Sequence, residues 1–173
     1  TTAARGLFNQ HLAGGAAIYH MDWVEEPAGA AWNRFGRAIQ KIDTGIGSAL
    51  LDIGLPDEDT KGDVSYLLTE LVCAEETWLV IDDFQLFQTV VPETVWNALI
   101  EYGAENLHTV ILTQRPVKIR MTLKPGVLYI GREDMRLTEC ETGEYFAWCG
   151  VSLLPEQIRT VSRYTEGWIA ALR

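Results

Sequence analysis

Two adjacent carboxylates end a short apolar run near the middle of the sequence. Asp82 and Asp83 lie in the segment WLVIDDF, residues 78–84. An open α/β sheet binds its ligands beyond the carboxyl ends of its strands. In phosphoryl transfer the first such acid orients Mg²⁺, usually through water, and the next acid can polarise the attacking water. We therefore predict a magnesium site at Asp82 and a catalytic role for Asp83; the alternative is that Asp82 caps the turn and Asp83 is solvated.

A second candidate lies at the end of the next predicted strand. HTVILTQR, residues 108–115, finishes with Thr113, Gln114 and Arg115. If the two strands are neighbours, Arg115 lies at the same edge of the sheet as the acids. Its guanidinium could then sense a terminal phosphate and stabilise the charge that develops on it. The alternative is an arginine that is solvated or ion-paired.

The first two residues are also candidates for nucleotide binding. Thr1 and Thr2 directly precede a predicted helix, where a phosphate-binding loop, GxxxxGK[ST], would end in its Mg²⁺-binding hydroxyl. The alternatives for Thr1 are a helix N-cap or a remnant of cloning. No GxxxxGK occurs in the 173 residues. We therefore interpret residues 78–84 as the Walker B strand of a P-loop domain whose first strand and loop are expected upstream of residue 1.

The rest of the pattern predicts the elements that position these residues. Near-continuous apolar strands alternate with amphipathic helices, which indicates an α/β fold with a parallel sheet covered on both faces. Thr44 to Gly62, rich in Gly and Asp, is expected to form a loop. Helices are expected over residues 4–12, 27–42, 64–72 and 92–102, and strands over residues 16–23, 78–82, 108–113 and 127–130.

After residue 131 the pattern becomes helical. Thr138 to Glu141 forms a Thr-x-x-Glu capping box that opens a helix to about Cys149, Pro155 starts a second helix, and Trp168 to Leu172 begins a third. We therefore predict two parts. An incomplete P-loop α/β core covers residues 1–131, and the start of a helical lid covers residues 132–173.

Composition limits the classes of partner. A formal net charge of −10 argues against direct DNA binding by this segment, because nucleic-acid affinity depends largely on Lys and Arg. A single nucleotide remains compatible, since backbone amides and a metal ion can outweigh that charge. The three cysteines show no zinc spacing and are read as reduced thiols. No apolar run approaches a membrane span and no secretory signal is evident, so a cytoplasmic location is expected.

The C-terminal run SLLPEQIRTVSRYTEGWIAALR, residues 152–173, closely resembles a family signature. It is similar to the LSPEEV…L…RTEGWPAGL motif of the large ATP-dependent LuxR-type regulators, the MalT-like branch of the STAND signal-transduction ATPases. The likeness extends through nearly the whole chain. AIYHMDWVEEPAGAAWNRFGRAI resembles the family's second strand and following helix, WLVIDDFQLF its Walker B segment, VILTQRP its sensor strand, and REDMRLT the start of its helical lid.

The resemblance implies an ATP-switched sensor. ATP or ADP with Mg²⁺ would occupy this domain, hydrolysis would be slow, and the protein would self-associate. A small-molecule inducer would bind a downstream repeat domain, and a C-terminal helix-turn-helix would bind promoter DNA. By position, Thr1 and Asp82 would hold Mg²⁺, Asp83 would align water and Arg115 would sense the γ-phosphate.

In the lid, the resemblance implies that Gly167 and Trp168 approach the nucleotide. Ile169 stands where the family often has Pro, which puts the contact with adenine in question, and Gln85 stands where His is common. Two other functions stay open. One is a degenerate STAND domain that serves as a non-catalytic interaction scaffold. The other is an unrelated P-loop enzyme, such as a kinase or helicase fragment, in which a lid with TEGW would have no role.

Overall fold

The computed structural model describes residues 17–23, 26–117 and 126–171. The chain divides into two compact units, Thr1–Met121 and Thr122–Arg173. The candidate residues Thr1 and Thr2, and the helix expected over residues 4–12, lie outside the described residues. None of the helices within the described ranges is long and apolar enough to cross a membrane.

The first unit is built on a parallel sheet of three strands. These are β1 (Ala17–Met21), β2 (Thr77–Ile81) and β3 (Leu107–Ile111), in the order β1-β2-β3. In the register, Met21 is level with Ile81, and Ile81 with Ile111. The carboxyl ends of all three strands therefore meet at one edge. The acid-bearing strand and the strand before Arg115 are neighbours, which is the condition under which Arg115 lies at the same edge as the acids.

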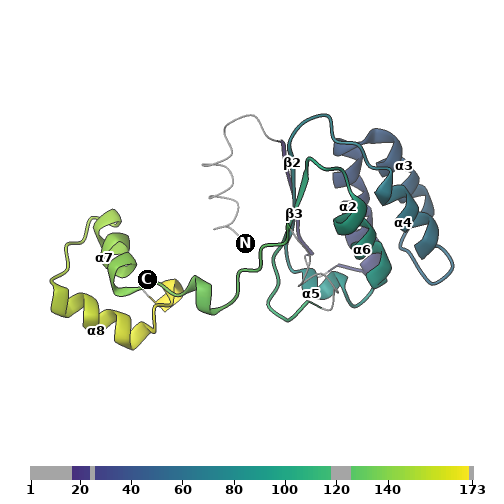
Figure 1. Cartoon of the computed structure of the whole chain (residues 1–173). Coiled ribbons are helices and arrows are strands. Elements are labelled where there is room, and N and C mark those ends of the chain that lie inside the picture. The colour runs from purple at the N-terminus through teal and green to yellow at the C-terminus, as the bar shows by residue number, and fades with distance from the viewer. Residues whose placement is uncertain (1–16, 24–25, 118–125, 172–173) are drawn as a thin grey trace. The chain divides into compact units, whose positions relative to one another are not determined.

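Four helices lie beside this sheet, namely α2 (Ala28–Ile42), α3 (Thr44–Ile53), α4 (Lys61–Thr69) and α6 (Glu93–Tyr102); α3 packs on α2 and α4 packs on α6. In Figure 1 all four lie on the same side of the strands. We predicted a sheet covered on both faces. Among the residues of the first unit that the structure describes, helices cover only one face. A short helix, α5 (Phe84–Phe87), follows the acids and was not predicted.

Between the sheet and the helices lies a core rich in aromatic rings. The ring of Trp96 is 5.4 Å from that of Phe35, 5.1 Å from that of Phe84 and 5.9 Å from that of Phe87, all in edge-on geometry. Alternate strand residues, among them Leu79 and Ile81 of β2, are buried in the same cluster. β2, the central strand, is therefore anchored firmly just before the acids.

The expected loop after residue 43 is wrong, because Thr44–Ile53 forms helix α3. Asp43 caps this helix, its carboxylate accepting hydrogen bonds from the backbone N–H groups of Gly45 (3.0 Å) and Ile46 (3.1 Å). At Gly47 an added Cβ would lie 2.1 Å from Cα of Gln40. Glycine here permits close packing of α3 on α2, so a residue that suggested a loop has a packing function.

The strand expected over residues 127–130 is also wrong. Val127, Leu128, Tyr129 and Ile130 form no strand, and their side chains are exposed. A short apolar run is compatible with a buried strand but does not identify the neighbour that would bury it. No neighbouring strand pairs with this run in the described part of the chain.

The second unit is a helical hairpin of α7 (Glu139–Trp148) and α8 (Pro155–Thr165), with single 3₁₀ turns at η1 (Glu133–Met135) and η2 (Ile169–Ala171). The predicted capping box is confirmed. The Thr138 hydroxyl accepts from the N–H of Glu141 (3.2 Å), and the Glu141 carboxylate accepts from the N–H of Thr138 (2.8 Å). A third helix was predicted to begin at Trp168. Among the described residues, this region forms only the single 3₁₀ turn η2.

Candidate functional site

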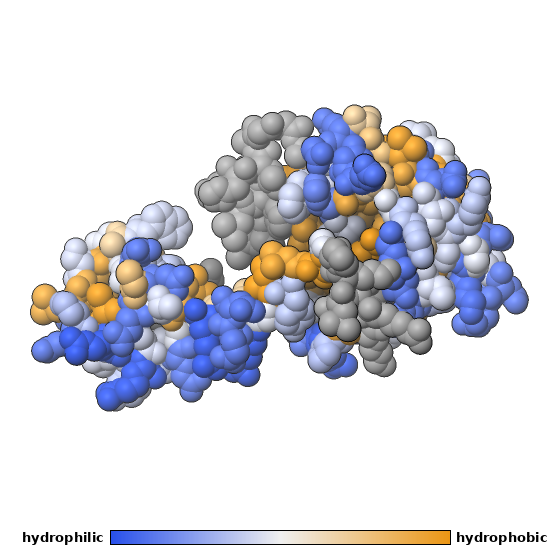
Figure 2. Space-filling model, viewed as in Figure 1, coloured by the Kyte–Doolittle hydropathy of each residue, from blue (hydrophilic) through white to orange (hydrophobic). Residues whose placement is uncertain are grey.

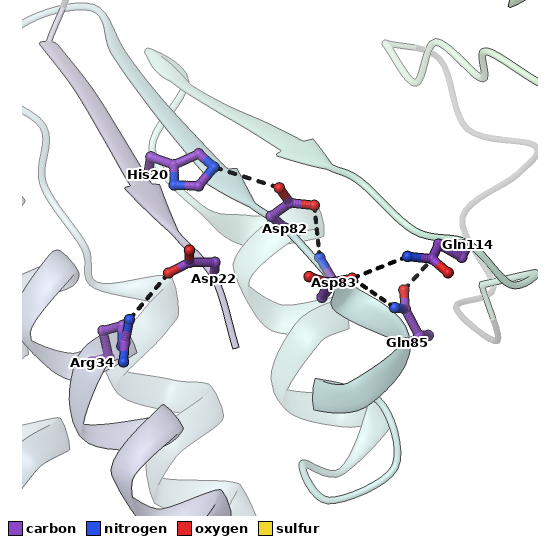
Figure 3. Close-up of polar contacts among 7 residues, drawn as sticks. All are labelled: His20, Asp22, Arg34, Asp82, Asp83, Gln85 and Gln114. Carbon is purple, nitrogen blue, oxygen red and sulfur yellow. Dashed lines mark hydrogen bonds and ion pairs between the residues drawn. The ribbon is translucent and has the colours of Figure 1, made fainter. Parts of the chain in front are cut away.

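Asp82 lies at the carboxyl end of the central strand and is almost completely buried, with 6% of its surface exposed. One carboxylate oxygen accepts a hydrogen bond from the N–H of Asp83 (2.9 Å). The other oxygen faces the imidazole of His20, with 3.7 Å between Oδ2 and Nε2 (Figure 3). The first of these contacts is the turn-capping role that the alternative interpretation of Asp82 predicts. Asp82 therefore has this capping contact and also lies at the carboxyl edge of the sheet.

His20 was not singled out from the sequence, where it reads as a polar position in a strand. The register pairs His20 with Val80, two residues before Asp82. Because side chains alternate across a strand, His20 and Asp82 emerge on the same face of the sheet. Once β1 is known to pair with β2, side-chain alternation identifies His20: it is paired with Val80, which lies two residues before Asp82 and on the same face.

Asp83 has an unusual backbone conformation. Its φ and ψ are 52° and 37°, in the left-handed region, and it directly precedes α5. For a residue with a Cβ this conformation costs of order 1 kcal/mol or more, although Asp tolerates it better than most residues. Its Oδ1 accepts hydrogen bonds from the side-chain amides of Gln85 (2.9 Å) and Gln114 (3.5 Å). Asp83 is therefore held by specific contacts and is not simply solvated.

Arg115 lies in the loop that follows β3. The Thr113 hydroxyl donates to the carbonyl of Arg115 (2.8 Å) and accepts from its N–H (3.2 Å), which makes a tight local turn. The Arg115 side chain itself is exposed. The structure thus brings Asp82, Asp83 and the Arg115 backbone to the same edge of the sheet.

A third acid at this edge, Asp22, follows β1 and was also missed. The Arg34 guanidinium pairs with Asp22 (3.1 Å) and with Glu26 (3.0 Å), as Figure 3 shows for Asp22. Arg34 is 42% exposed, so the pairs contribute little stability. They direct the Asp22 carboxylate toward α2, away from Asp82 and Asp83.

The donor set at the edge fits Mg²⁺ better than a metal that needs a protein cage. No group of three or more His, Cys, Asp or Glu that could hold a metal occurs within the described ranges. Mg²⁺ prefers hard oxygen ligands and is usually bound by one or two carboxylates together with phosphate oxygens and water. The buried Asp82 carboxylate suits that role, with Thr1 as its proposed companion outside the described residues.

Gly167 and Trp168 lie in the second unit, where both have local partners. Gly167 has a φ of 75°, and an added Cβ would lie 2.4 Å from the carbonyl oxygen of Leu137. The N–H of Leu137 donates to the carbonyl of Gly167 (2.9 Å). The Trp168 ring lies beneath the guanidinium of Arg132, 5.0 Å from its carbon to the ring centroid. TEGW therefore joins the end of the helical hairpin to its beginning.

Comparison with known proteins adds no relative. No protein-family model, curated protein or solved structure matches the chain.

Proposed function

We propose that the chain is the nucleotide-binding regulatory module of a signal-transduction ATPase, of the kind found in MalT-like LuxR-type regulators. One observation carries the proposal. Two adjacent carboxylates end the central strand of a parallel sheet, and the loop after the next strand bears an exposed Arg at the same edge. This arrangement supports the proposal, because in P-loop phosphoryl transfer an acid at the end of such a strand holds Mg²⁺ and a neighbouring polar group positions the attacking water.

Each residue has a role that follows from its surroundings. Asp82, buried and anchored by the N–H of Asp83, would hold Mg²⁺ together with Thr1. Asp83 uses Oδ1 for the two glutamine amides, and its other oxygen makes no hydrogen bond with a described residue, so this oxygen would orient a water molecule. The Arg115 guanidinium would approach the terminal phosphate. When bound, Mg²⁺ would neutralise phosphate charge in this acidic site.

The proposal extends to parts of a regulator beyond these residues. Nucleotide state would control self-association, a small-molecule inducer would act through a downstream domain, and a helix-turn-helix outside this chain would bind promoter DNA. The protein would be cytoplasmic and hydrolyse ATP slowly, because such switches use nucleotide state to control assembly. Gly167 and Trp168 would contribute to the lid.

The residues encoded immediately before Thr1 provide the first test. A GxxxxGK ending just before Thr1 supports the proposal, and any other sequence contradicts it. In the encoded protein, Asp82→Ala should reduce Mg²⁺-dependent ATP binding at least about tenfold in calorimetry, whereas Asp83→Asn should slow hydrolysis at least about tenfold with binding retained. Asp52→Ala, which removes an exposed acid of α3, is the matched control and should change neither. Equal behaviour of all three variants would remove the Walker B assignment.

The 173-residue chain alone gives a complementary test. Because it contains no GxxxxGK, millimolar MgATP should not raise its melting temperature appreciably. A clear increase would show that the described edge binds nucleotide without that loop, and the assignment of the missing half would be wrong.

A non-catalytic scaffold is the second candidate, and one observation favours it. The Asp82 carboxylate already caps the turn before α5, so a structural reason for this acid exists without nucleotide. A scaffold predicts that the encoded protein binds no MgATP and that Asp82→Ala lowers only its stability. The binding measurement above separates the two candidates.

A further inference from the structure

Both ends of the Gln85 side chain are used, each by a different segment. Its Nε2 donates to Oδ1 of Asp83 (2.9 Å), and its Oε1 accepts from the backbone N–H of Gln114 (3.1 Å). The Thr113 hydroxyl oxygen, whose proton is donated to the Arg115 carbonyl, lies 3.2 Å from the same Oε1. Figure 3 shows the amide between the acid and the loop. One half-buried side chain thus connects the segment after β2 with the segment after β3.

The orientation of this amide follows from its partners. A backbone N–H can only donate, so the atom that meets the N–H of Gln114 must be the oxygen. The nitrogen is then directed at the carboxylate of Asp83, which accepts. A carboxylate at position 85 would repel Asp83, and an apolar side chain would contact neither partner. The site is therefore built for a side chain with one donor end and one acceptor end.

We propose that Gln85 is a positioning residue that holds the Asp83 carboxylate and the loop of residues 113–115 in one arrangement. Displacing the loop moves the amide oxygen and withdraws its donor from Asp83, and the reverse also holds. The state of Asp83 is thereby transmitted to the segment that carries Arg115. The catalytic meaning of this coupling rests on the proposed function, whereas the coupling itself does not.

Amide hydrogen exchange of the 173-residue chain tests the coupling without nucleotide. In Gln85→Leu, protection of the Gln114 amide should fall about tenfold, as expected when one hydrogen bond is lost. The amide of Leu112, which donates to the carbonyl of Ile81 (2.9 Å), is the internal control and should change less than twofold. Unchanged protection of Gln114 would overturn the proposal.

A polarity swap tests whether Asp83 is the direct partner. Gln85→Glu keeps an acceptor for Gln114 but places two carboxylates together, so protection should again fall about tenfold. Adding Asp83→Asn supplies a donor from the opposite side, and the double variant should recover to within about threefold of the original chain. Asp83→Asn alone is the matched control. Its Oδ1 can still accept from Gln85, so protection of the Gln114 amide should be retained. A double variant no better than Gln85→Glu would contradict the direct contact.

A third measurement addresses the reaction in the encoded protein. Gln85→Leu should lower kcat for ATP about tenfold while the Kd for MgATP stays within about threefold, because Gln85 acts through Asp83 and the Arg115 loop. Full kcat with reduced Gln114 protection would show a merely structural bridge and overturn the positioning role. If the original protein does not bind MgATP, the proposed function fails, and the exchange data still decide the coupling.

Discussion

The two units of this chain are stabilised in different ways. All of the largest fully buried side chains lie in the first unit, including Trp32, Phe35 and Trp96. In the described part of the second unit only Thr142 and Gly167 are buried. The first unit is held together by apolar burial against a sheet, and the hairpin of the second by caps and a close backbone contact. The comparison shows that equally clear sequence motifs can rest on a deep core or on a few local hydrogen bonds.

The surface of the second unit shows the same contrast. Leu128 is 82% exposed, Trp148 83% and Tyr164 78%. Figure 2 shows apolar side chains at the surface of this smaller unit. Apolar area that stays in water contributes little to folding, so substitutions of similar size should have very different effects in the two units.

The largest expected effect comes from truncating a tryptophan in each unit. Trp96→Ala removes a ring that three phenylalanines contact and should lower the free energy of unfolding of the first unit by about 3–5 kcal/mol. Trp148→Ala, at an 83% exposed position, should change stability by less than about 0.5 kcal/mol. Urea unfolding followed by circular dichroism compares them, and similar losses would refute the contrast.

A methyl group at Gly167 should be the most damaging small change in the second unit. Gly167→Ala places a Cβ 2.4 Å from the Leu137 carbonyl oxygen at a φ of 75°, so destabilisation of about 1–3 kcal/mol is expected. Gly29→Ala in α2 is the control, because its Cβ would meet nothing within 4 Å and Ala favours helix. Thermal melting of both variants provides the measurement. A neutral Gly167→Ala would show that the backbone contact is dispensable.

The capping box should have a smaller effect that depends on pH. Hydrogen bonds from the backbone and side chain of Thr138 lower the pKa of Glu141, so the cap contributes stability at neutral pH that is lost as pH falls through the lowered pKa. Thr138→Ala should reduce the stability of α7 by about 1 kcal/mol at pH 7. The difference from the original chain should shrink as the pH falls below the ordinary pKa of a glutamate and through the lowered pKa of Glu141. A difference independent of pH would exclude the charged cap as its source.

The smallest perturbation is chemical labelling of the cysteines. Cys73 is buried in the first unit, and this burial raises the pKa of its thiol, whereas Cys140 and Cys149 are exposed in the second. The thiolate is the reactive form of cysteine. A disulfide reagent at pH 8 should therefore modify Cys140 and Cys149 at least about tenfold faster than Cys73. Mass spectrometry assigns the sites. Equal rates would mean that the first unit opens as readily as the second.

The sequence predicted the three strands and the helices that carry strong apolar periodicity, because those patterns are direct consequences of burial on a sheet. It failed where burial did not decide the structure. Gly47 resembled a loop signal although the residue is needed for contact between α2 and α3. The apolar residues 127–130 resembled a strand although their side chains are exposed.

The candidate site was predictable only as far as strand order allowed. Asp82, Asp83 and Arg115 follow from the rule that ligands bind beyond the carboxyl edge. The Gln85 bridge depends on the left-handed backbone of Asp83 and on a contact with Gln114 in the loop after β3. Neither has a sequence period, so local patterns contain no signal for it.

The contact between Leu137 and Gly167 also has a mechanical consequence. The Leu137 N–H to Gly167 carbonyl hydrogen bond closes a loop that contains the whole α7–α8 hairpin. If the second unit were pulled by its two ends, the force would act first on that hydrogen bond. Residues 138–166, which lie between its two partners, would bear no tension while it holds. The Leu137–Gly167 hydrogen bond would therefore bear the applied force, and the α7–α8 hairpin would extend only after this hydrogen bond breaks.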